Sequence, residues 1–191
     1  MTDDINAPHP TDLAQVLNFA WAALAPQIVQ DRRKSQVVTL STIDASGAPA
    51  ARSVILRDSD RPRGSIDIFT DAATPKCTEI ANDPRVALTL WRADMELQLR
   101  ITGLMDIIEG AAAHVAWSKL PEHALPNYGV TPAPGAQIAS ATSYQRSPDA
   151  ARFAILRLTI ADLDVVSLKS PTHTRARFER RDGWRGVWRA P

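Results

Sequence analysis

The first strong pattern of apolar positions lies near the start of the chain. Apolar residues recur there at spacings of three and four, which places them on one face of an amphipathic helix. Thr11 and Asp12 can cap the N-terminus of such a helix, and Pro26 disfavours its continuation. We therefore expect a helix at about 11–25 that packs on a larger body through Leu13, Val16, Leu17, Ala20, Trp21 and Leu24.

The pattern then changes to strands. Polar and apolar residues alternate with a period of two, most clearly over 95–102, and clusters of turn-forming residues separate the runs. Asp44 to Gly47 is a turn cluster in a hairpin context. We expect about eight strands among the runs 37–43, 48–56, 66–70, 86–91, 95–102, 153–160, 164–168, 175–180 and 184–189.

Short helices are expected between the strands. Thr74 and Pro75 fit the N-cap and the first position of a helix over 76–82, and the Ala-rich run 110–120 predicts another. The loop 121–135 contains four prolines, and a lid, a binding loop and disorder all stay open for it. We predict a single domain over 1–191 of the mainly β (α+β) class. Its strands should form an antiparallel barrel or a highly curved sheet with short peripheral helices, because closure of the sheet removes exposed strand edges.

Composition narrows the classes of partner. The chain has 22 basic and 21 acidic side chains, so it lacks the basic balance of a nucleic-acid-binding protein. No run approaches 18 apolar residues, which predicts no membrane span. The single Cys77 favours a reducing compartment, and we expect a cytoplasmic protein. The four histidines lack metal-ligand spacing, so we expect no metal site.

Candidate chemistry lies between Arg52 and Gln98. The chain has none of the glycine-rich phosphate-binding motifs and no nucleophile elbow, so side chains and helix ends must hold any nucleotide. Arg52 and Arg57 are five residues apart on a strand, and without a bulge this odd spacing points them to opposite faces. Thr74 and Lys76 add a hydroxyl and a cation at a helix N-terminus, which favours an anion. Gln98 offers a donor and an acceptor to a ring edge.

Taken together, these motifs resemble the pyridoxamine 5′-phosphate oxidase family of flavin mononucleotide (FMN)-binding proteins. The resemblance covers 36–103 well and 153–191 loosely, and it rests on the runs 52–57, 66–71, 74–76, 82–86, 96–103, 175–178 and 182–184. It implies a split β-barrel homodimer with FMN at the subunit interface.

The resemblance also implies roles for individual residues. Arg52 and Lys76 would hold the FMN phosphate beside Thr74, and Gln98 would hydrogen-bond the isoalloxazine ring. The flavin would be lined or bordered by Arg52, Ser53, Val54, Ile55, Leu56, Arg57, Phe69, Thr70 and Arg177. The candidates for substrate contact are Arg57, Lys119, His173 and Arg175.

The departures from the family pattern fall mainly on the substrate side. The family's Arg-x-His substrate pair reads His173-Thr174-Arg175 here, and its Ser-Arg-Lys phosphate loop reads Thr74-Pro75-Lys76. We therefore expect a related FMN-dependent oxidoreductase with an altered and unknown substrate, and we assign no catalytic residue. The alternative is a flavin carrier, sensor or regulatory module without turnover, since fold does not fix function.

Overall fold

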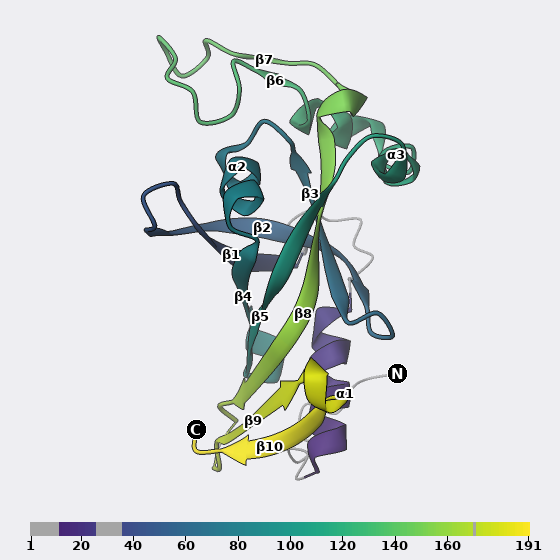
Figure 1. Cartoon of the computed structure of the whole chain (residues 1–191), viewed down its shortest axis with the longest axis vertical. Coiled ribbons are helices and arrows are strands. Elements are labelled where there is room, and N and C mark those ends of the chain that lie inside the picture. Colours follow the sequence, from purple (N-terminus) through teal and green to yellow (C-terminus); the bar gives the residue numbers. More distant parts are fainter. Residues whose placement is uncertain (1–11, 26–35, 170) are drawn as a thin grey trace.

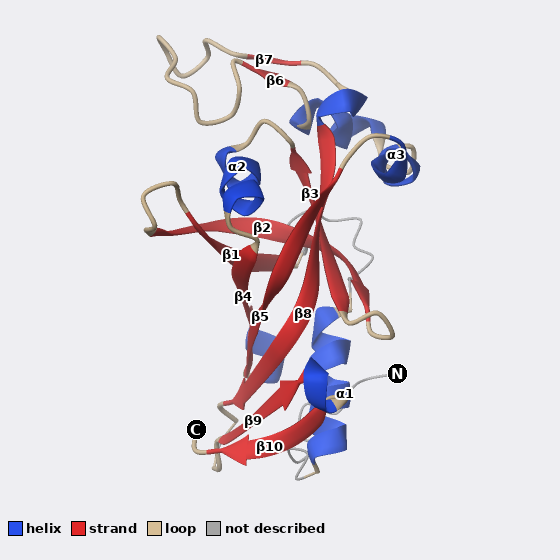
Figure 2. Ribbon diagram, in the orientation of Figure 1, coloured by secondary structure: helices blue, strands red, loops and turns tan. Residues whose placement is uncertain are grey.

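The computed structural model describes residues 12–25, 36–169 and 171–191, and its centre is a closed antiparallel barrel (Figures 1 and 2). One eight-stranded sheet has the order β10-β9-β8-β3-β2-β1-β4-β5, and β8 also pairs with β5, so six strands close on themselves. The barrel strands are β1 (Val37–Ile43), β2 (Pro49–Asp60), β3 (Ser65–Asp71), β4 (Arg85–Arg92), β5 (Leu97–Ile108) and β8 (Phe153–Ser167). This architecture confirms the predicted barrel.

Within the described residues, two further strands extend the barrel sheet and three α-helices pack outside it. β9 (Thr174–Glu179) and β10 (Arg185–Arg189) extend the sheet from the second half of β8. The helices are α1 (Leu13–Leu24), α2 (Pro75–Asn82) and α3 (Ala111–Trp117). α1 packs against β9 and β10, whereas α2 and α3 lie toward the other end of the molecule (Figure 1).

The helix predicted at 11–25 is confirmed as α1 over the described part. The Asp12 carboxylate caps it by accepting a hydrogen bond from the Ala14 amide at 2.7 Å. Its apolar face reaches the core, where the rings of Trp21 and Trp184 meet edge to face with centroids 6.2 Å apart. Thr11 lies outside the described residues.

The prediction of separate strands at 153–160 and 164–168 is wrong, because β8 is continuous over 15 residues. The register between β5 and β8 shifts near Gly103, where Thr102 pairs with Asp162 but Gly103 pairs with Ile160. Ala161 is the extra residue, and the buried positions change from even to odd numbers across it. A β-bulge has this effect, and it broke the alternation on which the sequence interpretation depended.

The strand expected to end at Leu56 continues to Asp60, so the turn before β3 is shorter than predicted. The segment 121–152 is also more structured than expected. It contains the 3₁₀ turns Glu122–Asn127 and Ala150–Arg152 and the small pair β6 (Val130–Thr131) and β7 (Gln145–Arg146). Another 3₁₀ turn, Ala93–Met95, precedes β5, and a further one, Arg180–Asp182, precedes β10. No helix among the described residues is long and apolar enough to cross a bilayer.

Most of the buried apolar side chains among the described residues form two clusters. The larger fills the barrel and extends to α1, with residues such as Leu40, Ile68 and Leu99 fully buried. The smaller lies outside the barrel wall, where α3 and Tyr128 pack on the first residues of β8. Its rings meet edge to face, with the Tyr128 and Phe153 centroids 4.9 Å apart. The wall between the clusters is β3 and β8, so neighbouring residues of these strands serve different cores.

Candidate functional site

The N-terminus of α2 gathers polar side chains. Thr74 is its N-cap residue and Pro75 its first residue, as predicted. The Thr74 hydroxyl does not cap the helix; it donates to the Asp71 carbonyl oxygen at 2.8 Å and accepts from Lys76 Nζ at 2.9 Å. The Thr70 hydroxyl oxygen lies 3.3 Å from that of Thr74. Two hydroxyls and an ammonium group therefore meet at the positive end of a helix dipole.

Arg52 reaches the same end of the barrel from β2. Its Nη1 donates to the Thr42 hydroxyl at 2.5 Å, and its Nη2 donates to Glu79 Oε2 at 2.6 Å. The Thr42 hydroxyl in turn donates to the same Glu79 oxygen at 2.5 Å. This triangle joins β1, β2 and α2, and it holds the Arg52 guanidinium in one place.

Arg52 and Lys76 form one electrostatic group. Burial lowers the pKa of Lys76, and the positive charge of Arg52 lowers it further, while Cys77, Asp71 and Glu79 oppose the shift. Two cations held this close together favour a bound anion between them, because its charge relieves their repulsion. The structure brings four of the predicted site residues close to Glu79, which was not predicted. The four are Arg52, Thr70, Thr74 and Lys76.

Arg57 points to the other side of the sheet, as the odd spacing predicts. Its guanidinium carbon lies 5.9 Å from the centroid of the Phe69 ring, and its charge acts on the hydroxyl of the buried Tyr128. Burial raises the pKa of Tyr128, and the positive charge of Arg57 offsets part of that rise. Arg57 is itself the bulged residue of β2, since Leu56 pairs with Ile68 and Asp58 with Asp67. The strand is regular from Arg52 to Leu56, so the bulge does not turn Arg57 to the side of Arg52. Arg52 and Arg57 therefore lie in separate surroundings, on opposite sides of the sheet.

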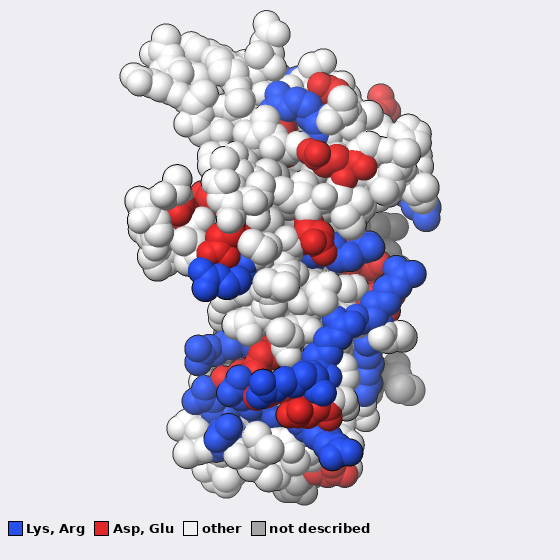
Figure 3. All heavy atoms as spheres, viewed as in Figure 1, with Lys and Arg blue, Asp and Glu red and all other residues white. Residues whose placement is uncertain are grey.

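Gln98 lies on the outer face of β5, in a row that runs across four strands. The row pairs Trp91 with Gln98, Gln98 with Val166, and Val166 with Arg175. In the next row Arg100, Asp164 and Arg177 are neighbours. Figure 3 shows Lys and Arg side chains gathered on this lower half of the molecule. Within the described residues, no hydrogen bond or ion pair joins this face to the group at α2.

The arginines of β9 are already paired. Arg175 donates to both carboxylate oxygens of Asp164 at 2.9 and 2.6 Å, and Arg177 donates to Asp162 at 2.7 Å. His173 is exposed before β9, and Lys119 is exposed after α3. Along β2, Ser53 is exposed, Val54 and Ile55 are half-buried and Leu56 is buried. The structure does not bring Lys119, His173 and Arg175 into contact with one another.

Sequence reasoning missed three residues of these sites, Thr42, Glu79 and Tyr128. Glu79 follows Lys76 by three residues, a spacing that places both on one helix face and could have indicated it. Thr42 lies on the strand that pairs with the Arg52 strand in the predicted hairpin, but it is 37 residues from Glu79. Tyr128 comes from a segment far along the chain from Arg57, and no motif marks either residue.

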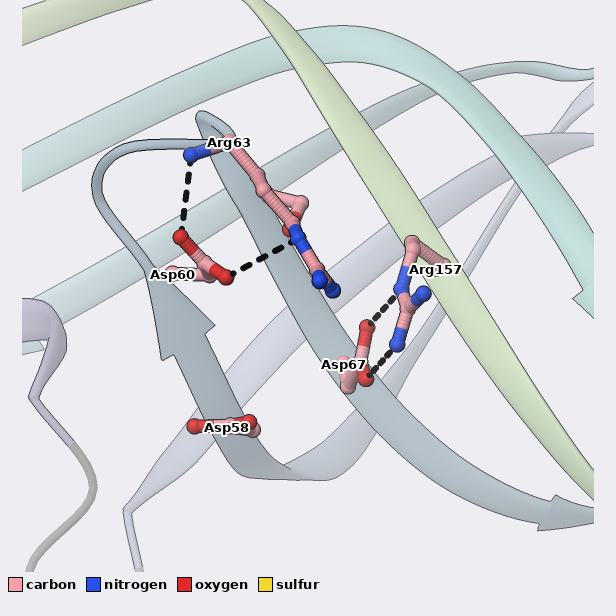
Figure 4. Close-up of a pocket in the computed structure, with 6 residues that line it drawn as sticks. Asp58, Asp60, Arg63, Asp67 and Arg157 are labelled. Atoms are coloured by element: carbon pink, nitrogen blue, oxygen red, sulfur yellow. Dashed lines mark hydrogen bonds and ion pairs between the residues drawn. The ribbon is translucent and has the colours of Figure 1, made fainter. Parts of the chain in front are cut away.

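A separate polar hollow lies at the β2–β3 hairpin (Figure 4). Arg157 binds both carboxylate oxygens of Asp67 at 2.8 and 2.6 Å, and Arg63 pairs with Asp60 at 3.3 Å. Asp58 and Ser65 complete the lining. Most of the charge here is compensated internally, and none of the sequence candidates contributes to it. Among the described residues, no group of three or more His, Cys, Asp or Glu side chains is arranged to hold a metal ion.

Fold and site together define a small antiparallel barrel with a group of cationic and hydroxyl side chains at one end. The family model described as "Pyridoxamine 5'-phosphate oxidase, FMN-binding domain" matches residues 18–109. This part of the chain contains Arg52, Lys76, Glu79 and Gln98. Residues 18–109 therefore match the FMN-binding domain of the pyridoxamine 5′-phosphate oxidase family, in agreement with the sequence resemblance.

Curated relatives carry the same family name. A pyridoxine/pyridoxamine 5′-phosphate oxidase of Cyanothece sp. is 33% identical over 112 residues, 59% of this chain and 50% of that protein. One from Rhodopseudomonas palustris is 25% identical over 99% of this chain and 82% of its own length. The chain matches about half or less of the length of the first curated relatives, so their activity is carried over only as a proposal.

Solved structures share the fold across the whole chain. A pyridoxamine 5′-phosphate oxidase-related FMN-binding protein of Nostoc punctiforme has a TM-score of 0.73 at 19% identity, covering 96% of this chain and 100% of its own. PhzG of Burkholderia lata, solved with tetrahydrophenazine-1-carboxylic acid, has a TM-score of 0.67 at 17% identity, covering 100% of this chain and 98% of its own. The fold is thus that of the split barrels of this family.

Proposed function

We propose that the chain binds FMN and acts as an FMN-dependent oxidoreductase with an altered substrate site. The observation that carries the proposal is that Arg52, bound to Glu79 in the middle of α2, acts electrostatically on Lys76, which lies with Thr74 at the N-terminus of the same helix. Cationic side chains, hydroxyls and a helix N-terminus are the groups that bind phosphate in proteins. The residues present therefore fit the phosphate of FMN.

The remaining flavin contacts are inferred from position. Phe69 and Thr70 are adjacent on β3 and would border the flavin, and Gln98 would hydrogen-bond the edge of its ring. The strand from Arg52 to Arg57 would line it. When bound, FMN would accept a hydride on its flavin ring, and the side chains of this chain would bind and orient the FMN.

A homodimer is part of the proposal. The side chains proposed to bind phosphate at α2 and the Gln98 face belong to different parts of one chain, so a second copy can complete each site. Two features of the surface support a partner. Trp91 and Val187 on the Gln98 face are each 49% exposed, although both are large apolar residues. The segment 131–145 carries no charged residue and projects from the top of the molecule (Figure 3).

Arg57 is the substrate-side candidate with the best-formed surroundings. It lies beside Tyr128 and over Phe69, outside the barrel wall, on the opposite side of β2 from Arg52. A guanidinium beside a phenol suits an anionic substrate, such as a phosphate ester or a carboxylate. Lys119, His173 and Arg175 stay candidates by resemblance alone, and the pairing of Arg175 with Asp164 leaves it less free to bind substrate.

A carrier, sensor or regulator without turnover is the second candidate function. It is favoured by the ion pairs that already engage Arg175 and Arg177, because paired arginines have fewer donors for a substrate. Bleaching of the bound flavin by a reduced nicotinamide, an amine or an alcohol under anaerobic conditions would support an oxidoreductase. A flavin that none of these donors reduces would favour the carrier.

The binding test compares FMN with riboflavin, which lacks the phosphate. Flavin fluorescence is titrated with the purified full-length chain. We expect FMN to bind at least about tenfold more tightly, since one charge-assisted phosphate contact contributes about 1.5–3 kcal/mol. Equal affinities for the two flavins would contradict the phosphate site, and no binding of either would contradict the flavin proposal as a whole.

A further inference from the structure

The carboxylate of Glu79 lies inside the group of cations proposed to bind phosphate. Its side chain is 13% exposed, and one of its oxygens accepts hydrogen bonds from both Arg52 and Thr42. We propose that Glu79 is a built-in counter-ion of this site, which fixes Arg52 and at the same time weakens phosphate binding. The inference rests on the proposed function. It assigns a role to Glu79, which is not among the residues that the family resemblance implied.

The positioning half of the proposal follows from the hydrogen bonds. The Arg52 side chain is 25% exposed, so it could adopt other rotamers if nothing held it. Glu79 binds Nη2 and Thr42 binds Nη1, on two separate nitrogens of one planar group. A guanidinium has five N–H donors, so several stay available for a phosphate. Arg52 is thus oriented before the ligand arrives, which reduces the entropy lost on binding.

The weakening half follows from charge. Arg52 and Lys76 contribute two positive charges and Glu79 one negative charge, so the group has a net charge of +1 rather than +2. A phosphate monoester carries between one and two negative charges near neutral pH. It would bind the same guanidinium that already binds Glu79, so the two anions repel each other at short range. The site then binds phosphate less tightly than its two cations alone would.

Glutamine at this position separates charge from shape. Glu79→Gln keeps a side-chain oxygen that can accept from Arg52, but it removes the negative charge. We expect the dissociation constant for FMN to fall by roughly 5- to 30-fold, because one close like-charge repulsion is lost. The affinity for riboflavin should change by less than about twofold, since riboflavin has no phosphate for the carboxylate to repel.

The matched control is Asp83→Asn. Asp83 follows the last residue of the same helix, and its carboxylate pairs with the exposed Arg85 rather than with Arg52. Its removal changes the net charge of the chain by the same amount. We expect the ratio of riboflavin to FMN dissociation constants to stay within about twofold of the wild-type ratio, whereas Glu79→Gln raises that ratio.

The experiment titrates FMN and riboflavin with the wild-type chain, Glu79→Gln and Asp83→Asn, at low and at high salt. Inorganic phosphate is included as a competitor of FMN, and it should compete at lower concentration against Glu79→Gln. The gain of Glu79→Gln should shrink at high salt, because screening weakens the repulsion that it removes. A substitution that only disturbed the fold would change the dissociation constants of FMN and riboflavin by the same factor.

Glu79→Ala is the second variant, for the case that Glu79→Gln folds poorly. It also removes the charge, but it frees Arg52, so we expect a smaller gain in FMN affinity than with glutamine. An unchanged or weaker FMN affinity in a folded variant, with the wild type preferring FMN over riboflavin, would overturn the role of Glu79 alone. A wild-type chain without that preference would overturn the phosphate site and the counter-ion with it.

Discussion

Arg152 clamps the buried carboxylate of Asp71 from 81 residues further along the chain. Its Nε and Nη2 donate to Asp71 Oδ1 at 2.9 and 2.8 Å, and Nη2 also donates to Oδ2 at 2.8 Å. Asp71 Oδ2 accepts from the Gly129 amide at 2.9 Å, and Arg152 Nη1 donates to the Val130 carbonyl oxygen at 2.9 Å. The pair therefore ties the end of β3 to the segment that carries Tyr128.

Asp71→Asn should destabilise the fold strongly. The Asp71 side chain is 3% exposed, and the neutral asparagine would leave the Arg152 guanidinium without its counter-charge. We expect a loss of about 2–4 kcal/mol in the free energy of unfolding, somewhat below a fully buried pair because Arg152 keeps some solvent contact. Urea unfolding measures it. Asp83→Asn, whose partner Arg85 is largely exposed, should change stability little.

The same carboxylate predicts a dependence on pH. Burial alone would raise the pKa of Asp71, but hydrogen bonds from the Gly129 and Ala73 amides and from Arg152 hold it below its ordinary value. The unfolded chain then binds this proton more readily than the folded one. The stabilisation is complete above the ordinary aspartate pKa of about 3.9, and it is lost as pH falls through the lowered value.

The measurement is the difference in unfolding free energy between the wild type and Asp71→Asn across pH. It should be constant from neutral pH down to about pH 5 and should shrink below about pH 4. A difference that grows on acidification would contradict the direction of the pKa shift.

Local patterns predicted those parts of the molecule that depend on neighbours in sequence. The alternation along β5 and the Thr74–Pro75 start of α2 come from periodicity and capping, which act over a few residues. The opposite directions of Arg52 and Arg57 also followed from spacing on one strand. These features needed no knowledge of the tertiary structure.

Features that depend on long-range contacts were not predictable in this way. The partners of Asp71 and Arg52 lie 81 and 27 residues away, and nothing in the local sequence couples them. The bulge at Ala161 made one strand resemble two, because it changes which positions face the core. The sequence therefore identifies the cations of the site, Arg52 and Lys76, but only the tertiary structure shows which residues surround them.

Arg52 and Arg57 should affect different ligands. Arg52→Ala removes a charge-assisted contact to phosphate, so we expect FMN affinity to fall by about 10- to 150-fold, equivalent to 1.5–3 kcal/mol. Arg57→Ala should lower FMN affinity much less, because its guanidinium lies over Phe69 on the other face. Parallel fluorescence titrations give both values. Equal losses in the two variants would contradict the assignment of separate sites, and Lys76→Ala is expected to resemble Arg52→Ala.

Gly103 should not tolerate a side chain. A Cβ atom there would lie 2.0 Å from the Thr159 carbonyl oxygen and 2.9 Å from a Leu158 methyl group, and the backbone contact cannot be relieved by a rotamer change. We expect Gly103→Ala to cost at least about 1–3 kcal/mol of stability through overpacking where β5 meets β8. Thr102→Ala, at the exposed neighbouring position, is the control. Thermal unfolding that leaves both variants equal to the wild type would contradict this close approach.

The proposed dimer predicts that flavin binding and association are coupled. If a second copy completes the site, Trp91→Glu should break the dimer by placing a charge in the interface, and it should weaken FMN binding as well. Val115→Glu makes the same change at another exposed apolar residue, on α3 and 61% exposed, and should alter neither. Light scattering and flavin titration of both variants test this coupling. A wild-type monomer that retains FMN at full affinity would show that one chain is sufficient, and the ring contact assigned to Gln98 would then be wrong.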